Sequence, residues 1–246
     1  MTTTIVIPAR LESKRLRRKL LLKDTGKTVL QHTWEAACKT QQADKVVIAA
    51  DDPELTEVAS AFGAEVYLTN PNHKSGTERI AELVRGNLEG DLIVNWQADE
   101  PLLPPEDVDR LIQIMLDRPA LQIATLAAPL TEDLLCSHST VKVAISQYGN
   151  ALYFSRAPLA EAKHHIGVYA FRRKILLQDF PHSRLAEAES LEQLVWLDYG
   201  YYIGTVQVQD APLSIDTAHD YERFVKIVQA TRPANGLAAT ARPASR

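Results

Sequence analysis

The sequence is poor in cysteine: only Cys38 and Cys136 occur among its 246 residues. They form no C-x-x-C pair and no disulfide framework, which excludes a small disulfide-stapled scaffold. Thiols without bridging partners are typical of a reducing compartment, and we expect a cytoplasmic protein.

Long apolar runs and glycine-rich phosphate motifs are also missing. No stretch of 18 apolar residues is present, so we expect no membrane span, and the first residues, MTTTIVIPAR, do not read as a signal peptide. No G-x-G-x-x-G occurs, and DTGKT (24–28) is no P-loop because Leu21 stands where its earlier glycine should be. The net charge of −4 argues against a nucleic-acid binder.

What is present in the first half is a regular alternation of apolar runs and amphipathic segments. The pattern predicts strands at 3–9, 45–50, 64–69 and 91–96, and helices at 28–40, 53–63, 76–87 and 105–117. Such β-α repeats imply a mostly parallel sheet covered on both faces.

The second half is richer in strands. Strands are predicted at 121–130, 141–146, 150–156, 165–171 and 202–209, some of them antiparallel, and helices at 189–200 and 218–230. The tail, 231–246, is small, polar and Pro-containing, and we predict that it is disordered.

Two features point to a site. The apolar run GDLIV is followed by NWQADEP (95–101), so a buried strand ends in Asp99 and Glu100, which suits a metal or substrate site, although a turn or helix cap would look similar. Five of the six residues from Lys14 to Lys19 are Arg or Lys, directly after the first strand, which suits a polyphosphate. A solvated surface run is the alternative interpretation of this basic loop.

The ordered set of motifs is more specific than any single one. IPAR (7–10) and the basic loop are followed by HKSGTERI (73–80), QADEP (97–101), LYFSRAP (152–158), HIGVY (165–169), LEQLVWL (191–197) and IDT (215–217). In this order they resemble the 3-deoxy-manno-octulosonate cytidylyltransferases, or CMP-KDO synthetases, from about residue 3 to residue 228.

The resemblance implies an α/β fold: a Rossmann-like nucleotidyltransferase three-layer sandwich, with a mostly parallel sheet and a smaller antiparallel part for sugar binding and dimerisation. Residues 1–230 would form one domain, with a nucleotide-binding half (1–117) and a sugar-binding and dimerisation half (118–230). The implied enzyme joins CTP to a 3-deoxy sugar acid with Mg²⁺, releases pyrophosphate, serves lipopolysaccharide synthesis and acts as a homodimer.

The resemblance also implies site residues. Those for catalysis and the triphosphate are Arg10, Ser13, Arg15 and Lys19, and the magnesium ligands are Asp99 and Asp216. Those near the cytosine and ribose are Ser75, Gly76, Thr77 and Arg79. Those facing the sugar acid are Gln97, Arg156, His165, Glu192 and Gln193. Glu100 is expected to be structural.

Three departures from the family pattern keep alternatives open. The family's Pro-Gly is Arg17-Arg18 here, its Gly before Asp-Glu-Pro is Ala98, and the connection at 157–164 is short. The alternatives are a cytidylyltransferase for another acidic sugar, such as an amino-substituted octulosonate or sialic acid, and a non-catalytic relative that binds nucleotide. A nucleic-acid module is disfavoured, because no aromatic residues interleave with the basic run.

Overall fold

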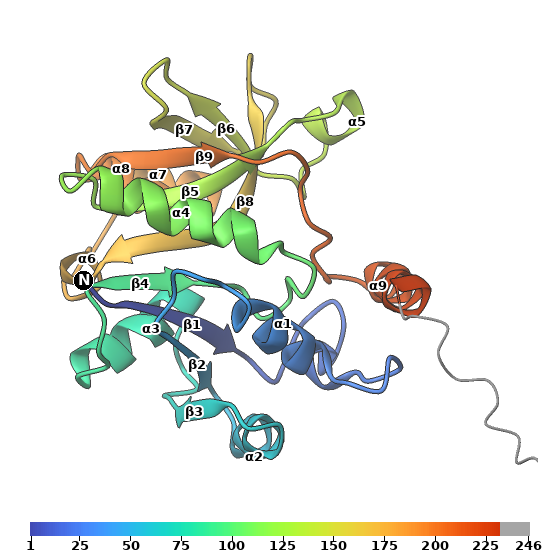
Figure 1. The fold of residues 1–246 in the computed structure, drawn as a ribbon. Helices are drawn as coiled ribbons and strands as arrows, with labels where there is room; N and C mark the ends of the chain where they lie inside the picture. The colour runs from blue at the N-terminus through green and yellow to red at the C-terminus, as the bar shows by residue number, and fades with distance from the viewer. Residues whose placement is uncertain (232–246) are drawn as a thin grey trace, which may run out of the picture.

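The computed structural model describes residues 1–231, so the predicted disorder of the tail concerns residues that lie almost wholly outside the described range. Within that range, one nine-stranded sheet runs through the molecule, and helices cover both of its faces (Figure 1). No helix in this range is long and apolar enough to cross a membrane.

The sheet is parallel in its first half and mixed in its second. Its strands are β1 (Thr3–Ala9), β2 (Lys45–Ala50), β3 (Glu65–Leu68), β4 (Leu92–Asn95), β5 (Ile123–Ala128), β6 (Lys142–Ile145), β7 (Ala151–Ser155), β8 (Lys163–Arg172) and β9 (Ile203–Gln207). The order is β3-β2-β1-β4-β8-β5-β9, with β8 antiparallel to β4 and β5. Outside this order, β6 pairs antiparallel with β8, and β7 pairs antiparallel with β6. The predicted fold class, mostly parallel with a smaller antiparallel part, is confirmed.

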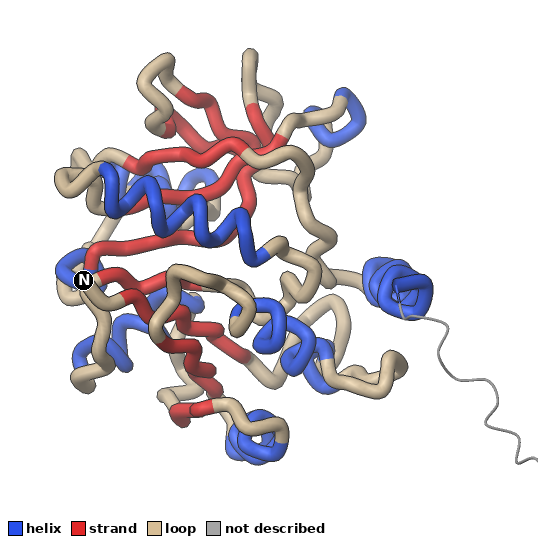
Figure 2. The backbone as a smooth tube through the Cα atoms, viewed as in Figure 1, coloured by secondary structure: helices blue, strands red, loops and turns tan. Residues whose placement is uncertain are grey.

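Helices pack on the two faces as the apolar periodicity predicts (Figure 2). They are α1 (Val29–Ala37), α2 (Pro53–Ala61), α3 (Gly76–Arg85), α4 (Pro105–Asp117), α5 (Glu132–Leu135), α6 (Arg173–Leu176), α7 (Arg184–Glu189), α8 (Gln193–Asp198) and α9 (Ala218–Thr231), with a 3₁₀ turn, η1 (Lys19–Leu21). Residues of α1, α2, α4 and α9 share one core cluster, and residues of α3, α6 and α8 share the other. Thr28, Asp52 and Ser75 cap α1, α2 and α3 by accepting backbone N–H groups.

The helix predicted at 189–200 is present but starts later and is shorter, and the helix before it, α7, was not predicted. The chain forms α7 up to Glu189, turns at Ser190 with a φ of 55°, and starts α8 only at Gln193, so Glu192 is the N-cap residue. The left-handed Ser190 ends the first helix because that conformation cannot continue a right-handed one.

The topology brings distant segments to the carboxyl ends of β1 and β4. The chain order reverses beside β1, which has β2 on one side and β4 on the other, and crevices at such switch points bind ligands. The segment between β9 and α9 crosses the same edge (Figure 1), where the Ile215 N–H donates to the Asp99 carbonyl at 2.9 Å.

Candidate functional site

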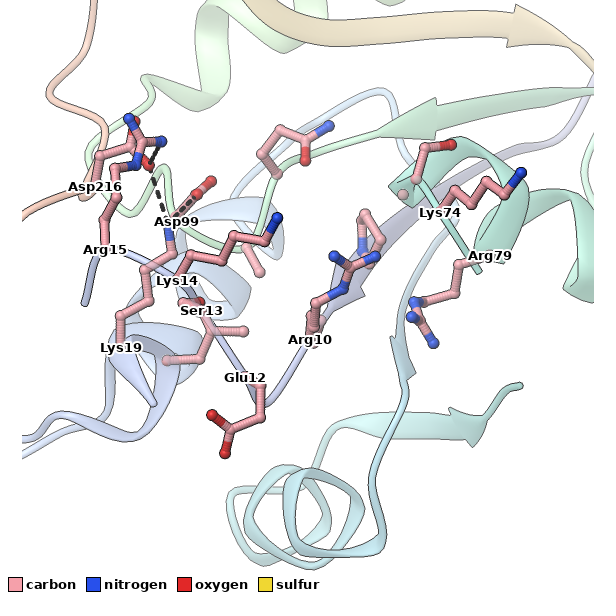
Figure 3. A pocket seen from close by; sticks show the side chains of 17 residues that line it. Arg10, Glu12, Ser13, Lys14, Arg15, Lys19, Lys74, Arg79, Asp99 and Asp216 are labelled. Carbon is pink, nitrogen blue, oxygen red and sulfur yellow. Dashed lines mark hydrogen bonds and ion pairs between the residues drawn. The ribbon is translucent and has the colours of Figure 1, made fainter. Parts of the chain in front are cut away.

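A pocket of about 400 Å³ opens at this edge of the sheet (Figure 3). Its walls come from the end of β1, the basic loop, the start of α3, the end of β4 and the segment before α9. The predicted residues that line it are Arg10, Ser13, Arg15, Lys19, Ser75, Gly76, Arg79, Gln97, Asp99 and Asp216. Residues far apart in the sequence therefore meet in one place.

Two carboxylates and a lysine form a charged cluster on one wall of the pocket. The Lys19 ammonium lies 2.6 Å from Asp99 Oδ2, 3.3 Å from Asp216 Oδ1 and 2.8 Å from the Ile215 carbonyl oxygen. Its side chain is only 11% exposed. Arg15 reaches the same Asp216 oxygen at 2.7 Å. Asp99 and Asp216 thus converge, although 117 positions separate them in the sequence.

These oxygens have the chemistry of a hard-cation site, since two carboxylates and a carbonyl already surround one positive charge. No group of three or more His, Cys, Asp or Glu side chains suited to a metal ion occurs within residues 1–231. Two carboxylates are nevertheless enough for Mg²⁺, which keeps several water or phosphate ligands. The acid pair therefore fits such an ion, with Lys19 as the chain's own cation between them.

On the opposite wall, two arginines gather around Asp51, the residue that follows β2. Arg79 is 2% exposed; its guanidinium donates to Thr69 Oγ1 at 2.6 Å and lies 3.5 Å from Asp51 Oδ2. Arg10 donates to the His73 carbonyl at 2.8 Å, and its Nε is 4.0 Å from the same Asp51 oxygen. Burial lowers the pKa of Arg79, the charge of Asp51 opposes this, and the charge of Arg10 adds to it.

The start of α3 must lie very close to β1. A Cβ atom at Gly76 would stand 2.9 Å from Pro8 Cγ, so any other residue would push the helix away from the strand. Ser75, just before it, accepts the Glu78 N–H at 3.2 Å. Ser75 and Gly76 therefore determine how close this wall of the pocket lies to β1.

The basic loop has an unusual backbone where the family has glycine. Arg18 adopts φ 53° and ψ 32°, a left-handed conformation that costs a residue with a Cβ about 1 kcal/mol. Its side chain pairs with Glu54 on α2, and both side chains are well exposed. The ion pair thus ties the loop to α2 but contributes little to stability.

We expect Arg18→Gly to change the free energy of unfolding by less than about 1 kcal/mol, because relief of backbone strain offsets the lost surface ion pair. Arg18→Ala loses the same ion pair and keeps the strain, so it should be less stable than Arg18→Gly by about 1 kcal/mol. Urea unfolding of both variants measures the difference. An Arg18→Ala protein as stable as Arg18→Gly would contradict the backbone argument.

A chain of polar contacts leads away from the pocket toward α8. Gln97 donates to Asn95 Oδ1 at 3.0 Å and to the Gly167 carbonyl at 3.2 Å, and Thr77 donates to Glu192 at 2.8 Å. Burial raises the pKa of Glu192, and the hydrogen bond from Thr77 opposes the rise. Thr77 and Glu192 line a second hollow of about 620 Å³ between α3 and α8, which Ser75 and Lys74 share with the first pocket.

The other predicted sugar-facing residues lie away from both hollows. His165 is buried between Phe154 and Tyr169, contacts Thr125 Oγ1 at 3.0 Å, and has its pKa lowered to about 3 by burial and by His164. Arg156 donates to the carbonyls of His138 and Ser139, and Gln193 is buried. Their contact with a sugar stays a prediction.

Sequence reasoning missed several residues of the site. Asp51 follows an apolar strand as Asp99 does, and the same signal could have found it. Asp51 stands behind the pocket lining, whereas Glu12, Lys74 and Lys14, the last from the predicted basic loop, line the pocket itself. Glu100 does not line the pocket. Burial raises the pKa of Glu100 to about 8; the charges of Asp99 and Asp216 raise this pKa further, and the charge of Lys19 lowers it.

Comparisons with known proteins agree on one kind of relative. The cytidylyltransferase family model matches residues 4–204. The 3-deoxy-manno-octulosonate cytidylyltransferase of Chlorobium phaeobacteroides is 42% identical over 90% of this chain and 95% of its own, and that of Escherichia coli is 39% identical over 87% and 90%. A solved structure of CMP:2-keto-3-deoxy-manno-octonic acid synthetase complexed with CTP superposes with a TM-score of 0.90 at 37% identity, covering 94% of this chain and 99% of that chain.

Proposed function

Because the chain belongs to the 3-deoxy-manno-octulosonate cytidylyltransferase family, we propose that it joins CTP to 3-deoxy-manno-octulosonate, giving CMP-3-deoxy-manno-octulosonate and pyrophosphate. A hydroxyl oxygen of the sugar acid attacks the α-phosphorus of CTP, and the bond between the α- and β-phosphates breaks. The observation that carries this proposal is the convergence of the basic loop and the Asp99–Asp216 pair in one pocket.

The residues of the pocket supply charge and alignment, which is most of what such a reaction needs. Arg10, Arg15 and Lys19 line it as cations that neutralise the triphosphate and stabilise the departing pyrophosphate. Gln97, at the end of the same wall, and Glu192 orient hydroxyl groups of the sugar acid. The N-terminal turn of α3, with Ser75 and Gly76, packs against the nucleoside.

Asp99 and Asp216 are the residues that would hold Mg²⁺, because they are carboxylates that already converge on one cation. When bound, the ion would supply Lewis-acid stabilisation of charge on the α-phosphate oxygens. We therefore propose that turnover requires Mg²⁺ and stops when a chelator removes it.

Pyrophosphate release tests the proposal directly. We expect release with CTP and 3-deoxy-manno-octulosonate, and a kcat/KM for ATP, GTP or UTP at least about tenfold lower, since a site that hydrogen-bonds one base leaves polar groups unpaired with another. The assay runs each triphosphate against 3-deoxy-manno-octulosonate, its amino-substituted analogue and sialic acid, with Mg²⁺ and with chelator. Comparable turnover with ATP or GTP would contradict a cytidine site, and preferred turnover of another sugar would reassign the acceptor.

We also propose that the enzyme works as a homodimer in the cytoplasm and provides an activated sugar for lipopolysaccharide synthesis. Cys38 and Cys136 are both free and exposed, which suits a reducing compartment. Leu152 on β7 and Tyr202 before β9 are large exposed side chains, 63% and 72% exposed, on the part of the sheet predicted to dimerise. Size-exclusion chromatography with light scattering tests the dimer.

A further inference from the structure

Asp51 joins three segments that form the pocket. Its Oδ1 accepts the Leu11 N–H at 2.9 Å, and its Oδ2 faces Arg79 at 3.5 Å and Arg10 at 4.0 Å. Its own N–H donates to the Ala9 carbonyl at 3.2 Å, which extends the pairing of β1 with β2. The Asp51 side chain is only 9% exposed and Arg79 is buried, so solvent screens their contact weakly, whereas Arg10 is 49% exposed.

The two arginines need this carboxylate. Arg10 and Arg79 line the same pocket and lie close enough for the charge of one to act on the other. Arg79 is buried, and its terminal nitrogen NH2 has no hydrogen-bond partner among the described residues. A buried guanidinium with a free donor and a like-charged neighbour is held in place by a negative charge beside it.

This nitrogen of Arg79 is the one that faces Asp51 Oδ2 at 3.5 Å, and it is buried from solvent, so the Asp51 carboxylate is the charge that compensates its missing hydrogen bond. The Leu11 contact has a second consequence. It holds the backbone at Leu11, directly before the cations of the basic loop.

We propose that Asp51 is a positioning residue for the nucleoside triphosphate: it holds Arg10, Arg79 and the start of the basic loop in the geometry that binds CTP. This rests on the proposed function for the identity of the ligand. Asp51 does not line the 400 Å³ pocket and touches neither reacting group; it acts through the two arginines.

Calorimetric titration of CTP into the full chain with Mg²⁺ and no sugar acid tests the proposal. Asp51→Asn keeps the acceptor for Leu11 and removes the charge, and we expect its Kd for CTP to rise about tenfold or more with unchanged stoichiometry. Asp52→Asn is the matched control: it removes one charge at the next position, and asparagine caps α2 as well as aspartate does. Its Kd should stay within about twofold of the wild type.

A purely structural role gives a different result, namely a lower fraction of binding-competent Asp51→Asn protein with the wild-type Kd. That result, or equal Kd values for Asp51→Asn and Asp52→Asn, would overturn the proposal. Asp51→Glu retains the charge and should bind CTP more tightly than Asp51→Asn; the reverse order also overturns it. Wild-type protein that binds CTP but releases no pyrophosphate with any sugar acid would refute the proposed function and leave the role of Asp51 standing.

Discussion

Asp99→Asn and Asp216→Asn are each expected to lower kcat with CTP and sugar acid by about a thousandfold while the fold remains intact. The two carboxylates converge on the Lys19 ammonium from distant parts of the chain, and asparagine preserves their shape without their charge. Losing one of two charged metal ligands should cost about 4 kcal/mol of transition-state stabilisation. Pyrophosphate release at saturating CTP measures the loss, and thermal unfolding reports the fold.

Asp117→Asn is a suitable control for this experiment. Asp117 ends α4 on the exposed surface, where its carboxylate accepts a hydrogen bond from Gln113 at 2.7 Å, away from the pocket. The Asp117→Asn substitution makes the same chemical change as the two site variants, and we expect it to leave kcat unchanged. Activity near the wild-type level in purified Asp99→Asn or Asp216→Asn protein would remove that residue from the metal site.

The parallel half of the fold could be predicted because its signals are local. Pro53 begins α2 after the Asp52 cap, Ser75 caps α3, and the apolar runs of β1, β2 and β4 are buried along their length or nearly so. The break between α7 and α8 could not be read in this way. Nothing in the sequence at Ser190 requires a positive φ, and the packing of Leu191 and Leu194 into the core decides where α8 starts.

The site was predictable as a set of residues but not as a set of contacts. The strand-end position of Asp99 indicated a site, yet its pairing with Lys19 depends on how the segment before α9 crosses the sheet. His165 shows the converse case. Its place in HIGVY indicates a ligand contact, but the side chain packs in a buried aromatic cluster, since neighbours on β5 and β7 surround it. Burial of this kind is set by tertiary packing rather than by the motif.

Lys19→Met is expected to have two opposite effects: weaker turnover and tighter binding of metal in the absence of nucleotide. An ammonium has three donors, and those of Lys19 all face protein oxygens, on Asp99, Asp216 and Ile215. Lys19 therefore cannot bind a phosphate without breaking its contact with Asp99 or Asp216. A metal ion in turn cannot bind both carboxylates while the Lys19 ammonium contacts them. Removing the lysine breaks the ion pair of Asp99 and leaves Asp216 paired with the exposed Arg15, a contact that solvent weakens. The affinity of the free enzyme for Mn²⁺, followed by electron paramagnetic resonance, should therefore rise about tenfold or more.

Turnover should fall by up to about a hundredfold in the same variant, because a charge-assisted contact to the triphosphate is lost. Lys14→Met separates the specific effect from general electrostatics: Lys14 lies in the same loop and lines the same pocket, and no ion pair of Lys14 with a carboxylate occurs within residues 1–231. Its removal should raise Mn²⁺ affinity only slightly, through screened long-range charge. In Lys19→Met with Asp99→Asn the gain should disappear, because a ligand is missing. Equal Mn²⁺ affinity in Lys19→Met and Lys14→Met would show that Lys19 does not compete with metal. Asp99 and Asp216 would then belong to a fixed ion-pair network with Lys19. They would not form a cation site that Lys19 occupies until nucleotide binds.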